Sequence, residues 1–197
     1  MKTLALLIAI SAFFAATLAA KSETMTLDTD KSKISWTGKK ITGSKHWGTI
    51  HFKSGSMEMN SGNIKSGTFK ADMTTIKVDD IEDKGSNAKL VGHLKSDDFF
   101  SVEKHNTAWF KIKSATKSGD KFKIKGSLTI KGITHDISFD AKLSKHGNGY
   151  KAVADMTFDR AKYDVRFNSG SFFENLGDNL IKDDIELKLE LHLSPAS

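Results

Sequence analysis

The chain has no cysteine and only one proline, and each absence removes a class of structure. Without cysteine there is no disulfide framework and no thiol for lipid attachment. Folding therefore does not depend on the redox state of the compartment. The single proline, Pro195, lies in the C-terminal tail, so no strand interior contains a residue that lacks a backbone N–H donor.

Long hydrophobic runs are absent after the first twenty residues. Residues 1–20, MKTLALLIAISAFFAATLAA, carry one charge, Lys2, and then an apolar stretch that ends in small residues. This pattern is typical of a secretory signal peptide, cleaved near Ala20. The alternative, a retained membrane anchor, would be a short span at about 1.5 Å per residue. We expect residues 21–197 to form a single domain, periplasmic or secreted, without stable membrane insertion.

Arginine is scarce, because 28 of the 30 basic residues are lysine. The lysines mostly alternate with apolar residues, which predicts a solvated outer face, and no basic run suggests a nucleic-acid partner. The two arginines, Arg160 and Arg166, both lie in FDRAKYDVRFNSG. Their planar guanidinium groups suit a bidentate partner. That partner is either an internal carboxylate, such as Asp159 or Asp164, or the polar head of a ligand.

Motifs for catalysis or metal binding are also missing. None of the seven histidines has the spacing of a metal site, and no nucleophile elbow, phosphate loop or dinucleotide fingerprint occurs. The acid pairs at 79–80, 97–98 and 183–184 lie at expected ends of helices or strands, where solvated caps explain them. We therefore expect no catalytic residue, no metal, no cofactor and no enzymatic activity.

The chain does contain clear alternation with a period of two. In residues 183–193, DDIELKLELHL, the apolar face consists of Ile185, Leu187, Leu189, Leu191 and Leu193. Similar patterns occupy residues 33–39, 48–52, 67–73, 107–115, 121–130, 133–143 and 151–158. Such alternation predicts antiparallel strands with one face in water and one face dry. The fold class is therefore all-β.

Eight strands predict a barrel, because closure removes the edges of a long meander. An eight-stranded barrel is just wide enough for packed side chains or for one small ligand. Two segments interrupt the meander, residues 79–106 and 161–182, and the first contains a helix-like run at 87–95. Each segment has an adjacent aromatic pair that we expect to cap the barrel mouth: Phe99 and Phe100 in the first, Phe172 and Phe173 in the second.

Several stretches resemble the YceI family of exported, lipocalin-like lipid-binding proteins, over roughly residues 24–193. The most specific is LVGHLKSDDFF, residues 90–100, with His93-Leu94-Lys95-Ser96, an acid and then two phenylalanines. The other stretches are LDTDKSKISWTGKK, GTFKADMTTIKVDD, GSLTIKGITHDISF and IKDDIELKLELHL. Two positions depart from the family pattern: His105-Asn106 replaces a tyrosine–proline pair, and Lys131 stands where relatives often have histidine. These departures affect the head-group preference more than the fold.

The resemblance implies an eight-stranded, antiparallel, lipocalin-like barrel with a short helix and loop insertion between early strands. It also implies an elongated apolar internal cavity that holds a long-chain lipid. The residues that we expect to line this cavity are Phe52, Phe69, Phe110, Ile112, Phe122, Ile124, Ile137, Phe139, Met156, Phe158, Leu187 and Leu189. The two phenylalanine pairs would gate it, and Arg160 would meet a polar head.

The expected function is that of an exported protein that sequesters or carries a polyisoprenoid, a quinone or a fatty-acid-type lipid. The alternative is a ligand-free barrel, filled by its own side chains, that acts as a stress-related or adhesive interaction module. Both hypotheses are compatible with a homodimer. The two hypotheses differ in the interior of the barrel, since only the first requires a cavity.

Overall fold

The structure is a computed structural model that describes residues 22–196, so the predicted signal peptide lies outside the described residues. Within that range the chain forms nine β-strands, one α-helix and two short 3₁₀ helices. The elements are β1 (Ser22–Leu27), β2 (Lys33–Lys39), β3 (Lys45–Asn60), β4 (Asn63–Val78), α1 (Lys84–Lys95), β5 (Thr107–Ser118), β6 (Lys121–Ile130), β7 (Ile133–His146), β8 (Gly149–Asp159), η1 (Arg160–Tyr163), η2 (Gly177–Asn179) and β9 (Asp184–Pro195).

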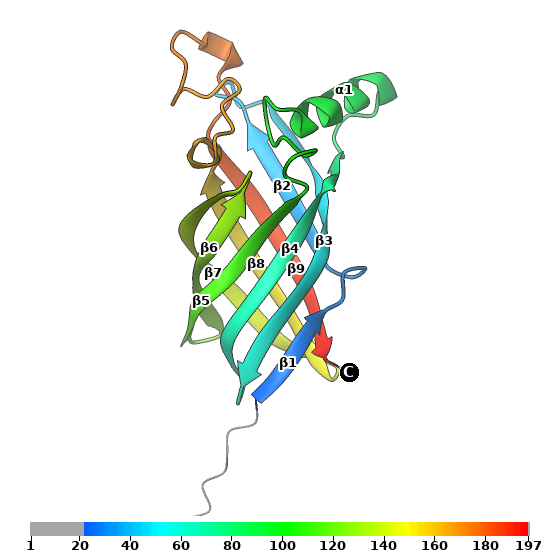
Figure 1. The fold of residues 1–197 in the computed structure, drawn as a ribbon, viewed down its shortest axis with the longest axis vertical. Helices are drawn as coiled ribbons and strands as arrows, with labels where there is room; N and C mark the ends of the chain where they lie inside the picture. The colour runs from blue at the N-terminus through cyan, green and yellow to red at the C-terminus, as the bar shows by residue number, and fades with distance from the viewer. Residues whose placement is uncertain (1–21, 197) are drawn as a thin grey trace, which may run out of the picture.

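The strands form one closed antiparallel barrel (Figure 1). Each strand from β2 to β8 pairs with the next strand in the sequence, and β9 also pairs with β2, which closes the barrel. The short strand β1 lies between β3 and β9, as β2 does, but closer to the lower end of the barrel. It pairs with the lower part of β3 and with the end of β9. The barrel therefore has eight positions, as predicted, although nine strands fill them.

All eight predicted strands are present, but β1 was not predicted, and β3 and β4 are far longer than expected. In β1 only Met25 and Leu27 are buried, which is too short a pattern to recognise in the sequence. Register shifts interrupt the pairing of β3 with β4 at three places, including Thr49/His51 and Phe52/Ser54. Beyond the shift at Phe52/Ser54 the buried positions of β3 change from even to odd numbers, so one 16-residue strand reads as a short fragment.

Helix α1 lies beside the upper end of the barrel in Figure 1. It begins after Asp83, whose carboxylate accepts a hydrogen bond from the Ser86 N–H at 2.8 Å. It ends at Lys95 and is capped by Ser96, whose backbone N–H donates to the carbonyls of Gly92 and His93. Lys95 then donates to the Thr74 carbonyl at 2.7 Å, which fixes the helix to β4. The chain that follows is thus positioned over the barrel.

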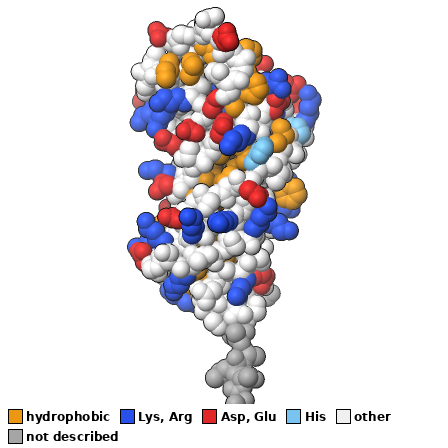
Figure 2. Space-filling view, turned by 90° about the vertical axis from the view of Figure 1, so that its left-hand side faces the viewer, with side chains coloured by type: hydrophobic (Ala, Val, Ile, Leu, Met, Phe, Trp, Pro, Cys, Tyr) orange, Lys and Arg blue, Asp and Glu red, His pale blue; other side chains and the backbone are white. Residues whose placement is uncertain are grey.

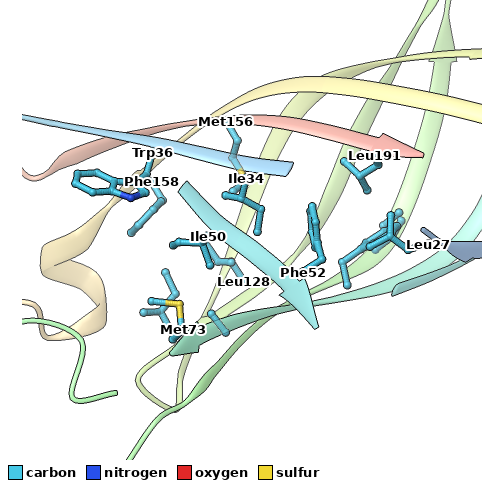
Figure 3. Packing of buried hydrophobic residues seen from close by; sticks show 14 of the residues in the cluster. Leu27, Ile34, Trp36, Ile50, Phe52, Met73, Leu128, Met156, Phe158 and Leu191 are labelled. Carbon is cyan, nitrogen blue, oxygen red and sulfur yellow. The ribbon is translucent and has the colours of Figure 1, made fainter. Parts of the chain in front are cut away.

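The outer face carries lysines interspersed with acids, as the sequence predicted (Figure 2). Ion pairs lie on this face, for example between Lys113 of β5 and Asp136 of β7, and between Lys142 of β7 and Asp120 in the β5–β6 turn. The inner face is apolar, and its lower end is tightly packed: Met25 and Met59 are almost fully buried. Figure 3 shows Ile34, Ile50 and Phe52 inside the barrel, where Ile34 of β2 lies opposite Ile50 of β3.

Candidate functional site

A pocket of about 240 Å³ lies inside the barrel, and side chains from every strand between β2 and β9 border it. Its lining is almost entirely apolar. It extends from the β2–β3 hairpin, at Lys40 and His46, down to Ile64 and Leu193 near the opposite end. The period-two alternation of the strands produces this lining, because every second side chain points inward.

Most of the predicted site residues border this pocket. They are Phe52, Phe69, Phe99, Phe100, Phe110, Ile112, Ile124, Phe139, Met156, Phe158, Arg160, Leu187 and Leu189. Their rings and branched chains contact one another across the interior; the centroids of Phe110 and Phe139, for example, are 5.4 Å apart. The structure therefore brings residues from seven different strands, the α1–β5 loop and η1 to one apolar surface. Whether they contact a ligand stays a prediction.

Four predicted site residues do not border the pocket. Phe122 is buried, but it belongs to the packed lower part of β6, and Ile137 is half-buried on β7. Phe172 and Phe173 are 40% and 50% exposed in the loop after η1, so the expectation that this pair caps the barrel mouth is wrong for the observed conformation. Inward positions of that loop are taken instead by Val165 and Ser169, both fully buried.

The pair Phe99 and Phe100 does lie at the pocket. The chain leaves α1 in a tight turn, in which the Phe99 N–H donates to the Ser96 carbonyl and the Phe100 N–H to the Leu94 carbonyl. A turn, unlike a strand, does not send adjacent side chains to opposite faces. Phe99 is buried against His93, with ring centroids 4.9 Å apart, while Phe100 is only half-buried.

Arg160 is the one fully buried cation among residues 22–196, with 1% of its surface exposed. Its guanidinium donates to four backbone carbonyls, those of Val165, Phe167, Ile181 and Lys182, at 2.9–3.3 Å. It also lies 3.3 Å from the Asp183 carboxylate. Burial lowers the pKa of Arg160, and Asp183 opposes that change. These contacts hold the two ends of the loop 160–183 together.

Of the two carboxylates that we expected as arginine partners, Asp164 does pair with an arginine, Arg166, but neither Asp164 nor Asp159 pairs with Arg160. Asp159 caps η1 by accepting from the Ala161 N–H at 2.9 Å, and Asp164 pairs with the exposed Arg166. Sequence proximity was misleading here, because the partner Asp183 approaches only when β9 closes beside β8. With these partners Arg160 has a structural role, and its contact with a ligand head group stays a prediction.

Sequence reasoning missed several residues that border the pocket: Trp36, Met57, Met73, Ile76 and Leu94. Trp36 and Met73 lie in recognised strands, so their inward phase was available as a signal. Met57 lies in the part of β3 that was not recognised as a strand. The indole N–H of Trp36 donates to the Lys77 carbonyl at 3.1 Å, which fixes the ring between β2 and β4.

Polar groups gather at the β2–β3 end of the pocket. The imidazole of His46 lies 2.7 Å from Asp80, and the Trp47 N–H donates to the same carboxylate at 3.0 Å. Burial raises the pKa of Asp80, but these hydrogen bonds outweigh it and hold that pKa below its ordinary value. Lys40 and Lys45 border the same opening. This end of the pocket therefore offers mainly cationic groups.

Among the described residues no three histidine, aspartate or glutamate side chains come together as metal ligands would. No helix within residues 22–196 is both long and apolar enough to span a membrane.

Comparison with known proteins places this architecture in a family. The profile of the YceI-like domain matches residues 25–193. A UPF0312 protein of Serratia proteamaculans is 37% identical over 71 residues, which cover 34% of this chain and 37% of that protein. One from Pseudomonas paraeruginosa is 32% identical over 110 residues, 54% of this chain and 55% of that protein. The chain thus spans about a third to a half of the length of these relatives.

Solved structures share the fold at low sequence identity. BcnA of Burkholderia cenocepacia has a TM-score of 0.67 at 19% identity, over 87% of this chain and 99% of that one. A polyisoprenoid binding domain of Saccharophagus degradans, implicated in plant cell wall breakdown, has a TM-score of 0.62 at 12% identity, over 87% and 98%. At such identities the likeness concerns the barrel and not its ligand.

Proposed function

The chain belongs to the YceI-like domain family, and on that premise we propose that it is an exported protein that binds a long-chain apolar lipid inside its barrel. The observation that carries this proposal is the apolar pocket of about 240 Å³. Polyisoprenoids and quinones are the leading ligands, and fatty acids or their amides come next. The neighbour from Saccharophagus degradans, a polyisoprenoid binding domain, supports this class of ligand.

The energy for binding comes from the burial of hydrocarbon. Transfer of one CH₂ group from water is worth about 0.8 kcal/mol, so one isoprene unit contributes roughly 3–4 kcal/mol. Several units exceed the ~4–15 kcal/mol cost of association. No charged recognition is then needed, and a pocket without carboxylates among its described lining residues suits such a ligand. Binding of this kind is tight but discriminates weakly between chain lengths.

The size of the pocket limits how the ligand is held. Pockets for drug-sized molecules measure about 300–1,000 Å³, and a dry cavity of about 150 Å³ holds benzene. A pocket of about 240 Å³ therefore takes part of a long chain, and the rest of the ligand lies outside or displaces side chains. The cations Lys40 and Lys45 at the β2–β3 end suit a polar or anionic head.

A binding role is favoured over catalysis by the distribution of polar groups. The pocket-lining Arg160 uses its donors on backbone carbonyls and Asp183, so it is committed to holding the loop. The remaining basic residues of the lining, the lysines and His46, lie at the rim. A catalytic site needs polar groups that converge on one reacting atom, and the interior side chains here are apolar.

Native mass spectrometry of the exported protein, followed by organic extraction and lipid mass analysis, tests this proposal. We expect a discrete added mass that extracts as an isoprenoid, a quinone or a fatty-acid derivative. A clean apo mass that persists after incubation with geranylgeraniol and decylubiquinone would support the filled barrel, and the search for a role would move to the outer surface.

A further inference from the structure

The barrel wall is incomplete along one seam, between β7 and β8. These strands pair only from Ala141–Ala154 to His146–Gly149, at the lower end. Above that point residues 133–140 have no partner on β8, although β7 stays paired with β6 and β8 stays paired with β9. Two regular strands therefore diverge and leave a split between two facing edges. We call the opening between residues 136–140 of β7 and 155–159 of β8 the β7–β8 split.

The pocket reaches the β7–β8 split. Phe139 and Ala141 on one side and Ala154 on the other border the pocket, and all three are partly exposed. Val153, at the lower end of the split, also borders the pocket and is 39% exposed. Figure 2 views the side on which β6 and β7 lie in Figure 1, and it shows hydrophobic side chains in a hollow at mid-height, bordered by charged ones.

Early loss of pairing does not by itself create an opening, as the seam between β4 and β5 shows. Residues 63–66 of β4 have no partner on β5. Nevertheless Ile64 and Ile112, which border the pocket there, are each only 6% exposed. Side chains cover that gap. At the β7–β8 split the inward residues Met156 and Phe158 of β8 are likewise 6% exposed. The split differs because Phe139, Ala141 and Ala154, which also border the pocket, stay partly exposed.

Helix η1 keeps the split open at its upper end. The ring of Tyr163, 1% exposed, lies between the two strands: its centroid is 5.3 Å from His135 of β7 and 5.7 Å from Phe158 of β8. Both contacts are edge-on, so the ring separates the strands as a wedge. Tyr163 lies where the strands would otherwise continue to pair.

Polar contacts fix η1 to β7 and its hairpin. The His135 imidazole lies 2.9 Å from the Lys162 carbonyl, and the Lys131 ammonium donates to the Asp164 carbonyl at 2.6 Å. The split is thus bounded above by η1 and below by the first paired rung at Ala141. Five residues of open strand between them correspond to a length of roughly 16 Å.

An open split carries costs that a closed barrel avoids. Unpaired strand edges invite association with other strands, and barrels normally remove them by closure. The wedge itself is imperfect, since the buried Tyr163 hydroxyl has no hydrogen-bond partner within residues 22–196. The unpaired edges and the unpartnered hydroxyl are both unfavourable, so a function of the opening would have to offset their cost.

We propose that the β7–β8 split is the portal through which the hydrocarbon chain of the ligand enters and leaves the pocket. This inference rests on the proposed function. A lateral portal lets a chain slide in sideways, without displacing the loop that Arg160 holds in place. It also explains how a ligand longer than the pocket is held, because the remainder of the chain leaves through the split.

A reversible cross-link tests the portal. Asp140 and Asp155 are the first unpaired residues above the Ala141–Ala154 rung and would form the next rung if the strands stayed paired. Both side chains are exposed on the outer face. Because the chain has no cysteine, the double variant Asp140→Cys/Asp155→Cys contains only these two thiols. They are joined as a disulfide or, if the thiols stay apart, by a short bis-maleimide. Either link closes the split without changing the inward face.

The matched control keeps one of the two thiols and moves the other. Asp155 is paired with Lys188 on the opposite, continuous seam between β8 and β9, and Lys188 is also exposed. In Asp155→Cys/Lys188→Cys the same strand is therefore linked to β9 instead of β7. This control contains the same chemistry but leaves the split open.

Uptake of decylubiquinone, a quinone that quenches tryptophan fluorescence, supplies the readout. Trp36 borders the pocket and is 8% exposed. Trp109 also borders the pocket but is 49% exposed, and Trp47 is 43% exposed, so both are first replaced by phenylalanine. Stopped-flow quenching then reports entry and displacement at Trp36. We expect cross-linking of residues 140 and 155 to slow both rates at least tenfold with little change in Kd. Reduction of the disulfide should restore the rates, and the control should not change them.

The outcomes separate the portal from the proposed function. Absence of Trp36 quenching in the uncross-linked protein would overturn lipid binding and the portal together. Quenching with the same rates before and after cross-linking would overturn the portal alone. A second measurement uses single cysteines at inward positions: Ala154→Cys at the split should react with aqueous maleimide at least tenfold faster than Ile124→Cys in the closed wall. Equal reactivity would also contradict the portal.

Discussion

The two edges of β8 behave differently although they belong to the same strand. One edge pairs with β9 from Tyr150 to Asp159, whereas the other pairs with β7 only up to Ala154. The alternation of apolar and polar residues is the same for both edges, because it describes faces and not edges. What differs is the segment that follows: η1 places Tyr163 between β7 and β8, and nothing separates β8 from β9. In this barrel the segment that follows β8 therefore determines how far the wall is closed.

Replacement of Arg160, which holds the loop 160–183 that follows β8, should cause the largest loss of stability. Arg160→Met leaves four backbone carbonyls and Asp183 without their cationic partner in a buried site. We expect a loss of about 3–5 kcal/mol in the free energy of unfolding, measured by urea titration. Arg166→Met is the control, because its partner Asp164 is exposed, and it should change stability little. Equal effects would contradict the structural role of Arg160.

Substitution of two phenylalanines tests the difference between the closed and the split parts of the wall. Phe122 is 3% exposed in the packed lower part, and Phe139 borders both the pocket and the split. Phe122→Ala should cost about 3–5 kcal/mol of stability, and Phe139→Ala distinctly less, since its site is already partly open. For decylubiquinone affinity we expect the reverse order. The pocket assignment would be wrong if Phe122→Ala weakened binding more than Phe139→Ala.

The contribution of Tyr163, the wedge residue, to stability should depend on pH. Burial raises the pKa of Tyr163 to about 12, from an ordinary value of about 10. The folded state holds this proton more tightly than the unfolded state, so its contribution to stability is complete below pH 10 and is lost between pH 10 and pH 12. Two pKa units correspond to roughly 2–3 kcal/mol.

Tyr163→Phe keeps the ring and removes the titrating hydroxyl. Near pH 8 this variant should be as stable as the parent or slightly more stable, because the hydroxyl has no partner. As the pH rises above 10 it should lose less stability than the parent, and the difference between the two should grow. Parallel curves of unfolding free energy from pH 8 to pH 11.5 would show that the hydroxyl is not buried as the structure has it.

The smallest effect is expected on the outer face. Lys113 pairs with Asp136, which lies at the edge of the split, and it lowers the pKa of that carboxyl group. Both side chains are exposed, so Lys113→Ala should leave the unfolding midpoint and the quinone uptake rates unchanged within error. A clear change in uptake would mean that charge at the edge of the split contributes to ligand entry.

The sequence allowed much of the barrel to be predicted and less of the site. Strand alternation identified Leu187 and Leu189 as inward residues, because the phase of a single strand suffices for that. It failed in β3, where register shifts change the phase, and so Met57 was missed. It failed for Phe172 and Phe173, because a loop has no period from which the direction of a side chain follows. The partner of Arg160 was missed because Asp183 is 23 residues away along the chain.

By itself, then, the sequence determined the all-β class, the antiparallel barrel, its lysine-rich outer face and its apolar interior, since all of these follow from a local period of two. The folded chain alone sets how far each pair of strands stays together, which loop fills the upper end and where the pocket meets the surface. Those features depend on contacts between residues far apart in the chain, such as Tyr163 with His135 and Arg160 with Asp183. Periodicity carries no information about such pairs, because each member satisfies its own local pattern equally well with or without its partner.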